Sequence, residues 1–418
     1  MSKKAKEAEP VVETASPKAM SLKEKQTKLR ALIQKSNEAA GHKVLAFANE
    51  VANTYEVRRP CGIIEIDLAT GGGLPAGSMN EISGPDNTGK TYLAMRYCLM
   101  HQRLYGDESF IAYAISEGQF DYRRAMHVGL KVSVPDELIA QWNQERVLRG
   151  MPEYTQEEYL FFKQKVGEFV IIRGNTGEEL LQGVANALRS NIFGIAVIDS
   201  ISAILPDADA EKELEEGNKM ASNASLVTKF VQRTTPSFNG LDGLNWATLI
   251  SINQVRANQE RANAPSYMQK AIKQWASVGA YAARHAKHID VQIQNGEKLK
   301  KTVKGAEKII GKVIKFELSK GKTGAHDNVK GEFSFFYDEW VPAGVNEVED
   351  LIVTGQRLGI IQEKAGKISV VQPDTNNAVV ADIDGFPAFK QQLQDDFEFF
   401  LVVMREVLAT KGIMCLFR

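Results

Sequence analysis

The chain has 418 residues, enough for two or three domains and a large apolar core. Its 51 Lys and Arg residues nearly balance its 52 Asp and Glu residues, so any basic binding surface has to be local. The three cysteines, Cys61, Cys98 and Cys415, show no paired spacing, which argues against a disulfide framework or a zinc site. No signal peptide or membrane-spanning stretch is recognisable, so we expect a cytoplasmic protein that does not bind membranes.

Residues 1–57 are predicted to form a disordered tail followed by an oligomerisation helix. Residues 1–20 are polar and charged, as in segments that cannot bury a core. Ser21, with Glu24 three positions later, has the pattern of a capping box, so a basic helix should begin there and end near Gly41. Its few apolar residues form a narrow stripe, which fits equally well a helix packed on its own chain and one that docks on a neighbouring subunit.

Residues 58–345 have the pattern of an α/β core. Nearly continuous apolar runs (MNEIS, FIAYAIS, FVIIRG, GIAVIDS and ATLISIN) alternate with helical segments such as GEELLQGVANALRS and ASLVTKFVQRTT. This pattern predicts a mostly parallel central sheet covered by helices on both faces. After Ile289, short alternating runs predict an antiparallel extension of the sheet. Residues 346–418 are predicted to form a small C-terminal α/β domain.

The stretch GPDNTGKT, from Gly84 to Thr91, matches the phosphate-binding pattern G-x-x-x-x-G-K-[ST]. Its glycines let the backbone wrap around phosphates, and the amides at the start of the following helix face negative charge. Lys90 is expected to contact the β- and γ-phosphates, and the Thr91 hydroxyl to hold Mg²⁺. The loop follows an apolar strand and opens a helix, which distinguishes it from a chance glycine-rich turn. The nucleotide-binding residues predicted on this loop are Gly84, Pro85, Asp86, Asn87, Thr88, Gly89, Lys90, Thr91 and Tyr92.

Two further strands end in carboxylates. Asp199 closes the apolar run GIAVIDS, and beside a phosphate loop in a parallel sheet it is the predicted Mg²⁺-organising acid. A hydrolase also needs a group that orients or deprotonates water. Glu117 and Asp121 both follow the run AYAIS, at the sheet edge where ligands of parallel sheets bind. The residues alone do not decide between these two carboxylates.

The segment IDLATGGGLPAGSMNEISGPDNTGKT resembles the corresponding region of RecA-type strand-exchange recombinases. The resemblance continues in order through ISEGQFD, NTGEELL, IAVIDSISAI, LISINQVR, KFELSKGKTG and EFSFFYDE, from Cys61 to about Gln372. It implies a RecA-like P-loop ATPase core that uses ATP and Mg²⁺ in DNA-dependent ATP hydrolysis. It also implies a helical filament on single-stranded DNA, pairing and strand exchange with homologous double-stranded DNA, and mediator and single-strand-binding proteins as partners.

The resemblance also implies roles for single residues. Glu117 would activate the attacking water, Asp121 would lie near the adenine, and Gln254 would sense the γ-phosphate. Lys320 and Lys322 would reach the ATP of a neighbouring subunit. Two cations one residue apart on a strand point the same way, so both could face one phosphate. Without the resemblance, these two lysines would be interpreted as a solvated edge, and Gln254 as a buried amide bonded to backbone.

Two DNA-binding loops follow from the same resemblance, at about residues 207–220 and 256–276. The second interleaves cations with flat or apolar groups, the combination that single-strand binding needs. An ordinary surface loop is the alternative. The first loop is acidic, so only its end is suited to DNA. The residues predicted to bind DNA are Lys219, Met220, Arg256, Arg261, Tyr267, Met268, Lys270, Lys273 and Trp275.

The chain departs from the family pattern in two places. Residues near 143–167 are additional to bacterial RecA and are predicted to form a helical insertion. The Lys-Phe pair that usually follows the second loop is missing, and Arg284 or Lys287 are candidates to replace it. This divergence suggests a phage-encoded or otherwise remote recombinase.

Two other classes of function compete with this interpretation. A hexameric helicase with a RecA fold shares the phosphate loop, but the Gly-Gly-Leu-Pro and Lys-Gly-Lys blocks and the C-terminal unit favour the recombinase. A non-catalytic filament protein would not need the intact set of Lys90, Thr91, Glu117 and Asp199.

Overall fold

The computed structural model describes residues 21–50, 56–204, 220–238, 246–257, 275–277, 285–303, 306–322, 325–337, 343–375 and 377–413. The chain divides into two compact units. One comprises residues 1–52 and 240–243, and the other comprises residues 53–239 and 244–418. Within the described ranges, no helix is both long and apolar enough to cross a membrane.

The described part of the first unit consists of helix α1 (Leu22–Ala40) and a short 3₁₀ turn, η1 (Ala48–Glu50). The predicted capping box is confirmed, because the Ser21 hydroxyl accepts the Glu24 amide and the Glu24 carboxylate accepts the Ser21 amide. Gly41 ends the helix in the left-handed conformation, with φ of 70°. No side chain of α1 is buried, so its apolar stripe is exposed.

The second unit is built on a nine-stranded sheet of mostly parallel strands, which confirms the predicted fold class. Its strands are β3 (Ser78–Gly84), β4 (Phe110–Ile115), β5 (Glu168–Ile172), β6 (Ile195–Asp199), β7 (Thr248–Ala257), β8 (Trp275–Ser277), β9 (Ile289–Val303), β10 (Ala306–Lys320) and β11 (Lys330–Phe336). The order is β11-β10-β9-β3-β7-β6-β4-β5, with β8 paired to β7. The strands from β9 to β5 run parallel, whereas β10 and β11 are antiparallel.

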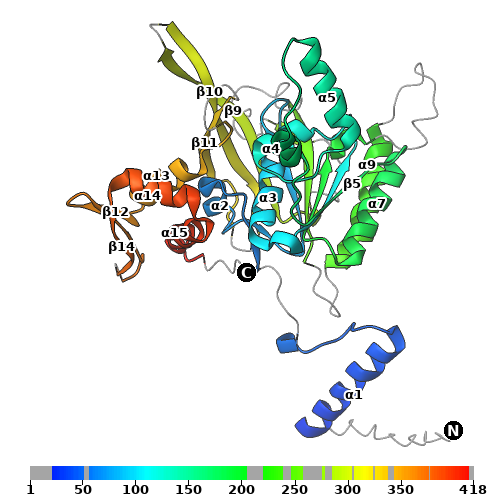
Figure 1. Ribbon diagram of the computed structural model, residues 1–418. Helices are drawn as coiled ribbons and strands as arrows, with labels where there is room; N and C mark the ends of the chain where they lie inside the picture. Colours follow the sequence, from blue (N-terminus) through cyan, green and yellow to red (C-terminus); the bar gives the residue numbers. More distant parts are fainter. Residues whose placement is uncertain are drawn as a thin grey trace, which may run out of the picture. The chain divides into compact units, whose positions relative to one another are not determined.

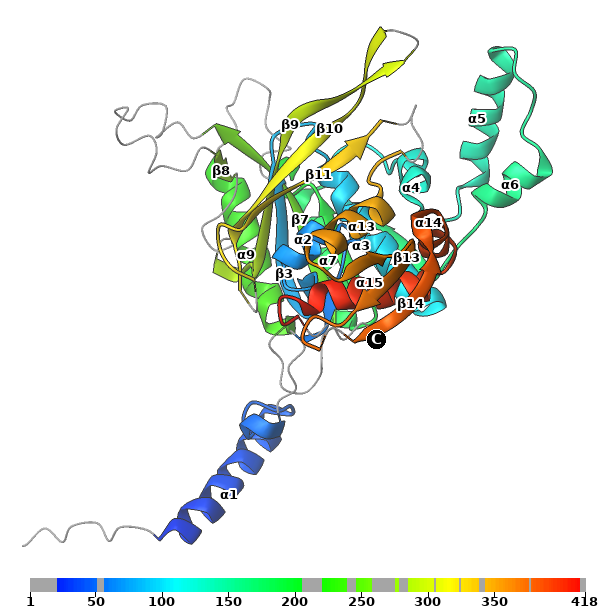
Figure 2. The ribbon, with the colours of Figure 1, turned by 90° about the vertical axis from the view of Figure 1, so that its left-hand side faces the viewer.

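The antiparallel extension differs in two ways from the sequence expectation. Strand β9 is itself parallel to β3, and β9 and β10 are 15 residues long rather than short. The first half of β9 buries Ile289, Val291 and Ile293, whereas its polar second half forms a solvated hairpin with β10. Both ribbon views show this hairpin extending beyond the rest of the sheet (Figures 1 and 2). The alternating pattern of β9 and β10 therefore continues beyond the buried part of the sheet into the solvated hairpin.

Strand β4 shows how the sheet separates two cores. Ile111 and Tyr113 point to the side of α3 (Lys90–Tyr105), and Ala112 and Ala114 point to the opposite side. That opposite side is covered by α7 (Gly177–Ser190) and α9 (Met220–Phe238) (Figure 1). Side chains alternate between the two faces of a strand. A strand that is buried on both faces therefore carries apolar residues at successive positions.

Residues 136–162 form a helical hairpin of α5 (Asp136–Leu148) and α6 (Gln156–Phe162), which stands out from the core (Figure 2). The insertion predicted near 143–167 is helical, but its first helix begins earlier. Val134, Ile139 and Trp142 form a small core of their own with partly buried aromatic residues. The start of α5 therefore belongs to the same packed element.

The C-terminal segment combines three helices with a small antiparallel sheet. Its elements are α13 (Glu347–Arg357), β12 (Ile361–Lys364), β13 (Lys367–Val371), β14 (Ala378–Asp384), α14 (Gly385–Asp395) and α15 (Phe397–Ala409). They enclose a separate hydrophobic cluster, to which Ile64 of the core also contributes. The segment lies in the same compact unit as the sheet, so a domain boundary at 346 stays a prediction.

The remaining short elements connect these layers. They are β1 (Arg58–Arg59), α2 (Ile64–Ala69), β2 (Leu74–Pro75), η3 (Gly106–Glu108), α4 (Tyr122–Val128) and η4 (Ile201–Ala203).

Candidate functional site

The topology brings four predicted site residues to one edge of the sheet. Strands β3, β7, β6 and β4 are consecutive and parallel, so their carboxyl ends meet there. Strand β3 leads into the phosphate loop, Gln254 lies near the end of β7, Asp199 ends β6, and Glu117 follows β4. Ligands of open parallel sheets bind at this edge.

The phosphate loop wraps around the amine of Lys90. The Lys90 Nζ donates hydrogen bonds to the carbonyls of Gly84 (3.0 Å) and Pro85 (2.7 Å). A Cβ on Gly84 would lie 2.4 Å from the Ile293 carbonyl of β9, so only glycine fits against that strand. Gly89, at φ of 96°, turns the chain into α3 in a conformation that other residues rarely adopt. The sequence therefore produces a loop that presents backbone amides and one cation at the start of a helix.

Burial lowers the pKa of Lys90, and the carboxylates of Asp86, Asp199 and Glu117 oppose this effect. The lysine therefore lies in the field of three acids. An additional negatively charged phosphate would favour its charged form further.

Thr91 and Asp199 are arranged as a pair of oxygen ligands. The Thr91 hydroxyl donates to the Asp199 Oδ2 at 3.0 Å, and the Tyr113 hydroxyl donates to the same oxygen at 2.9 Å. Burial raises the pKa of Asp199, the two hydrogen bonds lower it, and the charge of Glu117 raises it further. Mg²⁺ binds hard oxygen atoms, usually through one or two carboxylates together with substrate phosphates. A hydroxyl beside a carboxylate therefore fits Mg²⁺.

No group of three or more His, Cys, Asp or Glu side chains that could hold a metal ion occurs among the residues that the structure describes.

Glu117 is connected to the strand of Gln254 by two serines. The Ser200 hydroxyl donates to Glu117 Oε1 at 2.8 Å and contacts the Ser202 hydroxyl at 2.8 Å. The backbone amide of Gln254 donates to the Ser202 hydroxyl at 3.3 Å. Sequence reasoning missed Ser202 and Tyr113. The spacing of two serines directly after Asp199 was the available signal for Ser202.

Asp121 has a different place. Its side chain caps α4 by accepting the Arg124 amide at 2.9 Å, and it also lines the cavity above the phosphate loop. The two carboxylates that the sequence left undecided are thus separated. Glu117 is hydrogen-bonded in the network beside Asp199, and Asp121 is a helix cap.

A cavity of about 590 Å³ lies against the phosphate loop and is lined by residues 87–92. Lining residues outside the predicted set are Arg123, Arg124, His127, Val128, Lys312, Ile314, Phe335, Tyr337, Ala343 and Gly344. The predicted residues Gly84, Pro85 and Asp86 do not line it. Lys312 donates to the Asn87 carbonyl at 2.7 Å, and burial lowers its pKa. The cavity therefore combines cations with aromatic rings, a combination suited to phosphates and a flat base.

Lys320 and Lys322 converge on one point. Both amines donate to the backbone carbonyl of His285, at 3.2 and 3.3 Å. Burial, followed by the charges of Lys322 and Lys287, lowers the pKa of Lys320 to about 8. Lys322 therefore lies close enough to Lys320 to disfavour the charged form of Lys320.

The same two lysines lie far from the phosphate loop of their own chain. On β10, Lys312 contacts the loop, whereas Lys320 pairs with Asp290 at the opposite end of the strand. Eight residues of extended strand span about 27 Å. Lys320 and Lys322 therefore cannot contact phosphates bound at their own Lys90.

Lys287 belongs to a buried ionic cluster between β3 and β9. Its amine lies 2.8 Å from Glu81 Oε1 and 2.7 Å from Asp290 Oδ2. The three side chains are only 5–8% exposed. This arrangement contradicts the expectation that Lys287 contacts a neighbouring subunit, because its charge is used inside its own. Arg284, the other candidate, lies outside the described residues.

The predicted DNA segments are described only at their ends. Strand β7 continues to Ala257 and pairs with β8, so the backbone of Arg256 lies opposite Ala276, and that of Ala257 opposite Trp275. Met220 begins α9. The predicted residues Lys219, Arg261, Tyr267, Met268, Lys270 and Lys273 lie outside the described residues.

Several curated proteins that are similar to this chain are named "Protein RecA". The chain is 27% identical to "Protein RecA" of Bacteroides thetaiotaomicron over 353 residues, which cover 82% of this chain and 87% of the relative. It is 28% identical to "Protein RecA" of Porphyromonas gingivalis over 334 residues, covering 78% and 79%. The resemblance to the RecA family is confirmed. For "Protein RecA" of Oleidesulfovibrio alaskensis the identity is 25% over 316 residues, covering 75% and 73%. No family model matches the chain. At identities of 25–28%, the chain is a divergent relative of these RecA proteins.

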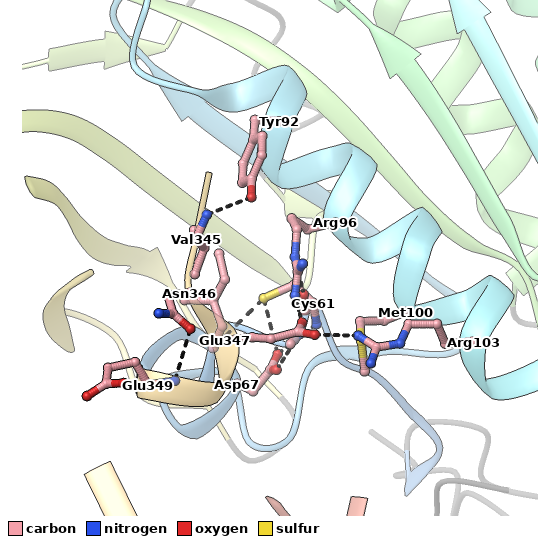
Figure 3. Close-up of polar contacts among 12 residues, drawn as sticks. Cys61, Asp67, Tyr92, Arg96, Met100, Arg103, Val345, Asn346, Glu347 and Glu349 are labelled. Atoms are coloured by element: carbon pink, nitrogen blue, oxygen red, sulfur yellow. Dashed lines mark hydrogen bonds and ion pairs between the residues drawn. The ribbon is translucent and has the colours of Figure 1, made fainter. Parts of the chain in front are cut away.

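In this RecA-like core, the helix after the phosphate loop is fastened to the C-terminal segment (Figure 3). The Tyr92 hydroxyl accepts the Val345 amide at 2.9 Å. Arg96 forms a short ion pair with Glu347, and Arg103 pairs with the other oxygen of Glu347 at 2.6 Å. Tyr92, Arg96 and Arg103 share one face of α3, since residues spaced by three or four positions lie on the same side of a helix. Helix α3 therefore follows the phosphate loop directly and also contacts the C-terminal segment through Tyr92, Arg96 and Arg103.

Proposed function

We propose that this chain is an ATP-dependent recombinase that forms filaments on single-stranded DNA, pairs it with homologous double-stranded DNA and exchanges strands. Hydrolysis of ATP to ADP and phosphate, stimulated by DNA, would allow the filament to dissociate. The observation that carries the proposal is the meeting of Lys90, the Thr91–Asp199 pair and Glu117 at one sheet edge. These are the groups that phosphoryl transfer to water needs.

The chemistry follows from these positions. The loop amides and Lys90 would hold the β- and γ-phosphates, and Thr91 and Asp199 would hold Mg²⁺, which supplies charge neutralisation on the phosphates. Glu117 would accept a proton from the attacking water. The Ser200 hydroxyl, which donates to one carboxylate oxygen of Glu117, would leave the other oxygen for the water.

The separation of Lys320 and Lys322 from their own phosphate loop supports the filament. If consecutive subunits contact each other head to tail, one subunit's lysines would face the next subunit's ATP. There they would stabilise charge on the γ-phosphate, as an arginine finger does. ATP would then hold adjacent subunits together, and its hydrolysis would loosen the filament.

The DNA contacts stay predictions from the sequence. The basic and aromatic residues between Arg256 and Trp275 would bind phosphates and stack on bases. The pairing of β7 with β8 supports this, since it connects the strand of Gln254 directly to that segment.

A mixing experiment tests the proposal. Lys320→Ala/Lys322→Ala protein should bind nucleotide through its own Lys90 but lose DNA-stimulated hydrolysis. Lys90→Ala protein should lose hydrolysis as well. In a mixture, junctions that pair an intact loop with intact lysines should recover part of the activity. Hydrolysis is measured across mixing ratios, and filaments on single-stranded DNA are observed by electron microscopy.

The matched control is Lys308→Ala/Lys315→Ala, which removes two exposed cations from the same strand. This protein should hydrolyse ATP by itself, without mixing. If both site variants are folded and no ratio recovers hydrolysis, the lysines do not act across an interface. If the wild-type chain shows no DNA-stimulated hydrolysis at all, the proposed function is wrong.

A further inference from the structure

We propose that Ser202 is a positioning residue that couples the end of β7 to Glu117 through Ser200. The inference rests on the proposed function, because Glu117 matters only if the chain hydrolyses ATP. Four groups form the path: the Gln254 amide, the Ser202 hydroxyl, the Ser200 hydroxyl and the Glu117 carboxylate.

The direction of each hydrogen bond along this path is determined. A serine hydroxyl has one hydrogen to donate and two lone pairs to accept with. Ser200 uses its hydrogen on Glu117 Oε1, so in the 2.8 Å contact between the two serines Ser202 has to be the donor. Ser202 in turn accepts the Gln254 amide. All donors along the path therefore point toward the carboxylate, and each acceptor is polarised by the donor before it.

Neighbouring secondary-structure elements fix the positions of both ends of this hydrogen-bonded path. On one side, Gln254 lies opposite Gly84, the first glycine of the phosphate loop, in the parallel pairing of β3 and β7. On the other side, Ser202 lies in η4, directly after the buried Ile201. Ser200 is itself buried, and its amide donates to the Ser116 hydroxyl at 2.9 Å. The β7 end of the path leads toward the second predicted DNA-binding loop, which carries most of the residues predicted to bind DNA.

The consequence is a mechanical connection between that segment and the catalytic base. Binding of DNA to the residues after Ala257 would set the position of the Gln254 amide, and with it the positions of the Ser202 and Ser200 hydroxyls. Glu117 is exposed, so without these bonds its carboxylate has several rotamers available. The path selects the rotamer in which Oε1 faces Ser200 and the other oxygen is available for water. DNA would therefore raise the fraction of subunits whose base is correctly oriented.

The test compares Ser202→Ala and Ser202→Thr with the wild-type chain. Turnover and KM for ATP are measured with and without single-stranded DNA, and DNA affinity is measured separately. Ser202→Ala breaks the path but leaves the Ser200–Glu117 bond in place. We expect the ratio of DNA-stimulated to DNA-free turnover to fall about 3- to 10-fold, the effect of one net hydrogen bond. KM for ATP and DNA affinity should change less than about two-fold. Ser202→Thr keeps the hydroxyl and should keep the ratio.

The control is Ser190→Ala, at the end of α7, where the hydroxyl donates to the Ala187 carbonyl and accepts a hydrogen bond from the Ile192 amide, both within a few residues of it. It should leave the ratio unchanged. An unchanged ratio in Ser202→Ala overturns the inference, as does an equal loss in Ser202→Thr. Both outcomes assume a wild-type chain that DNA stimulates, so they are distinct from a failure of the proposed function.

Discussion

Two ionic clusters, one on α3 and one between β3 and β9, have opposite compositions. On α3, Arg96 and Arg103 enclose the single carboxylate of Glu347. Between β3 and β9, Glu81 and Asp290 enclose the single amine of Lys287. The first cluster has one positive charge in excess and the second has one negative charge in excess.

The difference appears in the titration of the central groups. Burial alone would raise the pKa of Glu347, but the two arginines outweigh it and hold the pKa at about 2. Burial alone would lower the pKa of Lys287, but its two carboxylates outweigh it and raise the pKa. The neighbouring charges therefore favour the ionised forms of Glu347 and Lys287.

The clusters also have different neighbours. The first joins the helix of the phosphate loop to the C-terminal segment, and Arg103 also stacks on Phe397 at 4.1 Å. The second lies inside the sheet, and its Lys287 contributes to the low pKa of Lys320. The comparison suggests that the first cluster connects two parts of the fold, whereas the second also contributes to the lowered pKa of Lys320.

The largest effect is expected from Glu347→Ala. Removal of the carboxylate leaves two arginines without their buried partner, and breaking such a pair costs about 3–5 kcal/mol of unfolding free energy. Arginine does not lose its proton in proteins, so the loss should be the same at pH 5 and pH 7. Urea unfolding at both pH values measures it. Lys390→Ala, which removes an exposed partner of Glu349, is the control and should cost about 0–1 kcal/mol. A cost below about 1 kcal/mol for Glu347→Ala would show that the arginines find other partners.

A smaller effect is expected from Lys287→Met, which keeps the volume but removes the cation. Two buried carboxylates then face each other, at a cost of about 3 kcal/mol at pH 7. Unlike arginine, a carboxylate can bind a proton, which raises its folded-state pKa above the unfolded value. The stability of this variant is therefore lost as pH rises and partly regained at pH 5. Unfolding curves at the two values check this. A loss that is equal at both would contradict the assignment of the cost to charge.

The smallest effect is expected from Asp350→Asn, one turn after Glu347 on the same helix. Burial, followed by the charges of Glu65 and Glu349, raises the pKa of Asp350 to about 7, and the minor contribution of Arg96 does not compensate. With a folded-state pKa above the unfolded one, wild-type stability is complete below about pH 4 and is lost as pH rises through about 7. Asp350 is only half-buried, so solvent screening reduces the effect of this pKa shift to about 1–2 kcal/mol. The variant should be more stable by this amount at pH 8, and at pH 4 it should gain nothing. Thermal unfolding across this range measures the crossover. A gain that is independent of pH would mean that the amide acts by its own hydrogen bonds.

Much of the fold was predictable, because its signals are local. Apolar runs of strand length, a capping box at Ser21 and glycines around Lys90 each depend on a few neighbouring residues. The predicted strands therefore appear in the sheet, and Thr91 and Asp199 lie where a strand followed by a phosphate loop should place them. The lengths of β9 and β10 were wrong, because polar alternation continues in a solvated hairpin. The bounds of the insertion relative to bacterial RecA stay a prediction.

The sequence by itself determined a parallel α/β sheet with a phosphate loop, and the identity of the residues at its carboxyl edge. Only the tertiary structure decided which distant residues meet. Glu117 and Ser202 are 85 positions apart, and Lys287 and Glu81 are 206 apart. Such contacts depend on strand order and on the register between parallel strands. No local pattern encodes these, because each pairing is the outcome of packing the whole sheet. The packing of the sheet brings the Ser202 hydroxyl to the Gln254 amide and Lys287 to Glu81. It also places Lys320 away from the phosphate loop of its own chain.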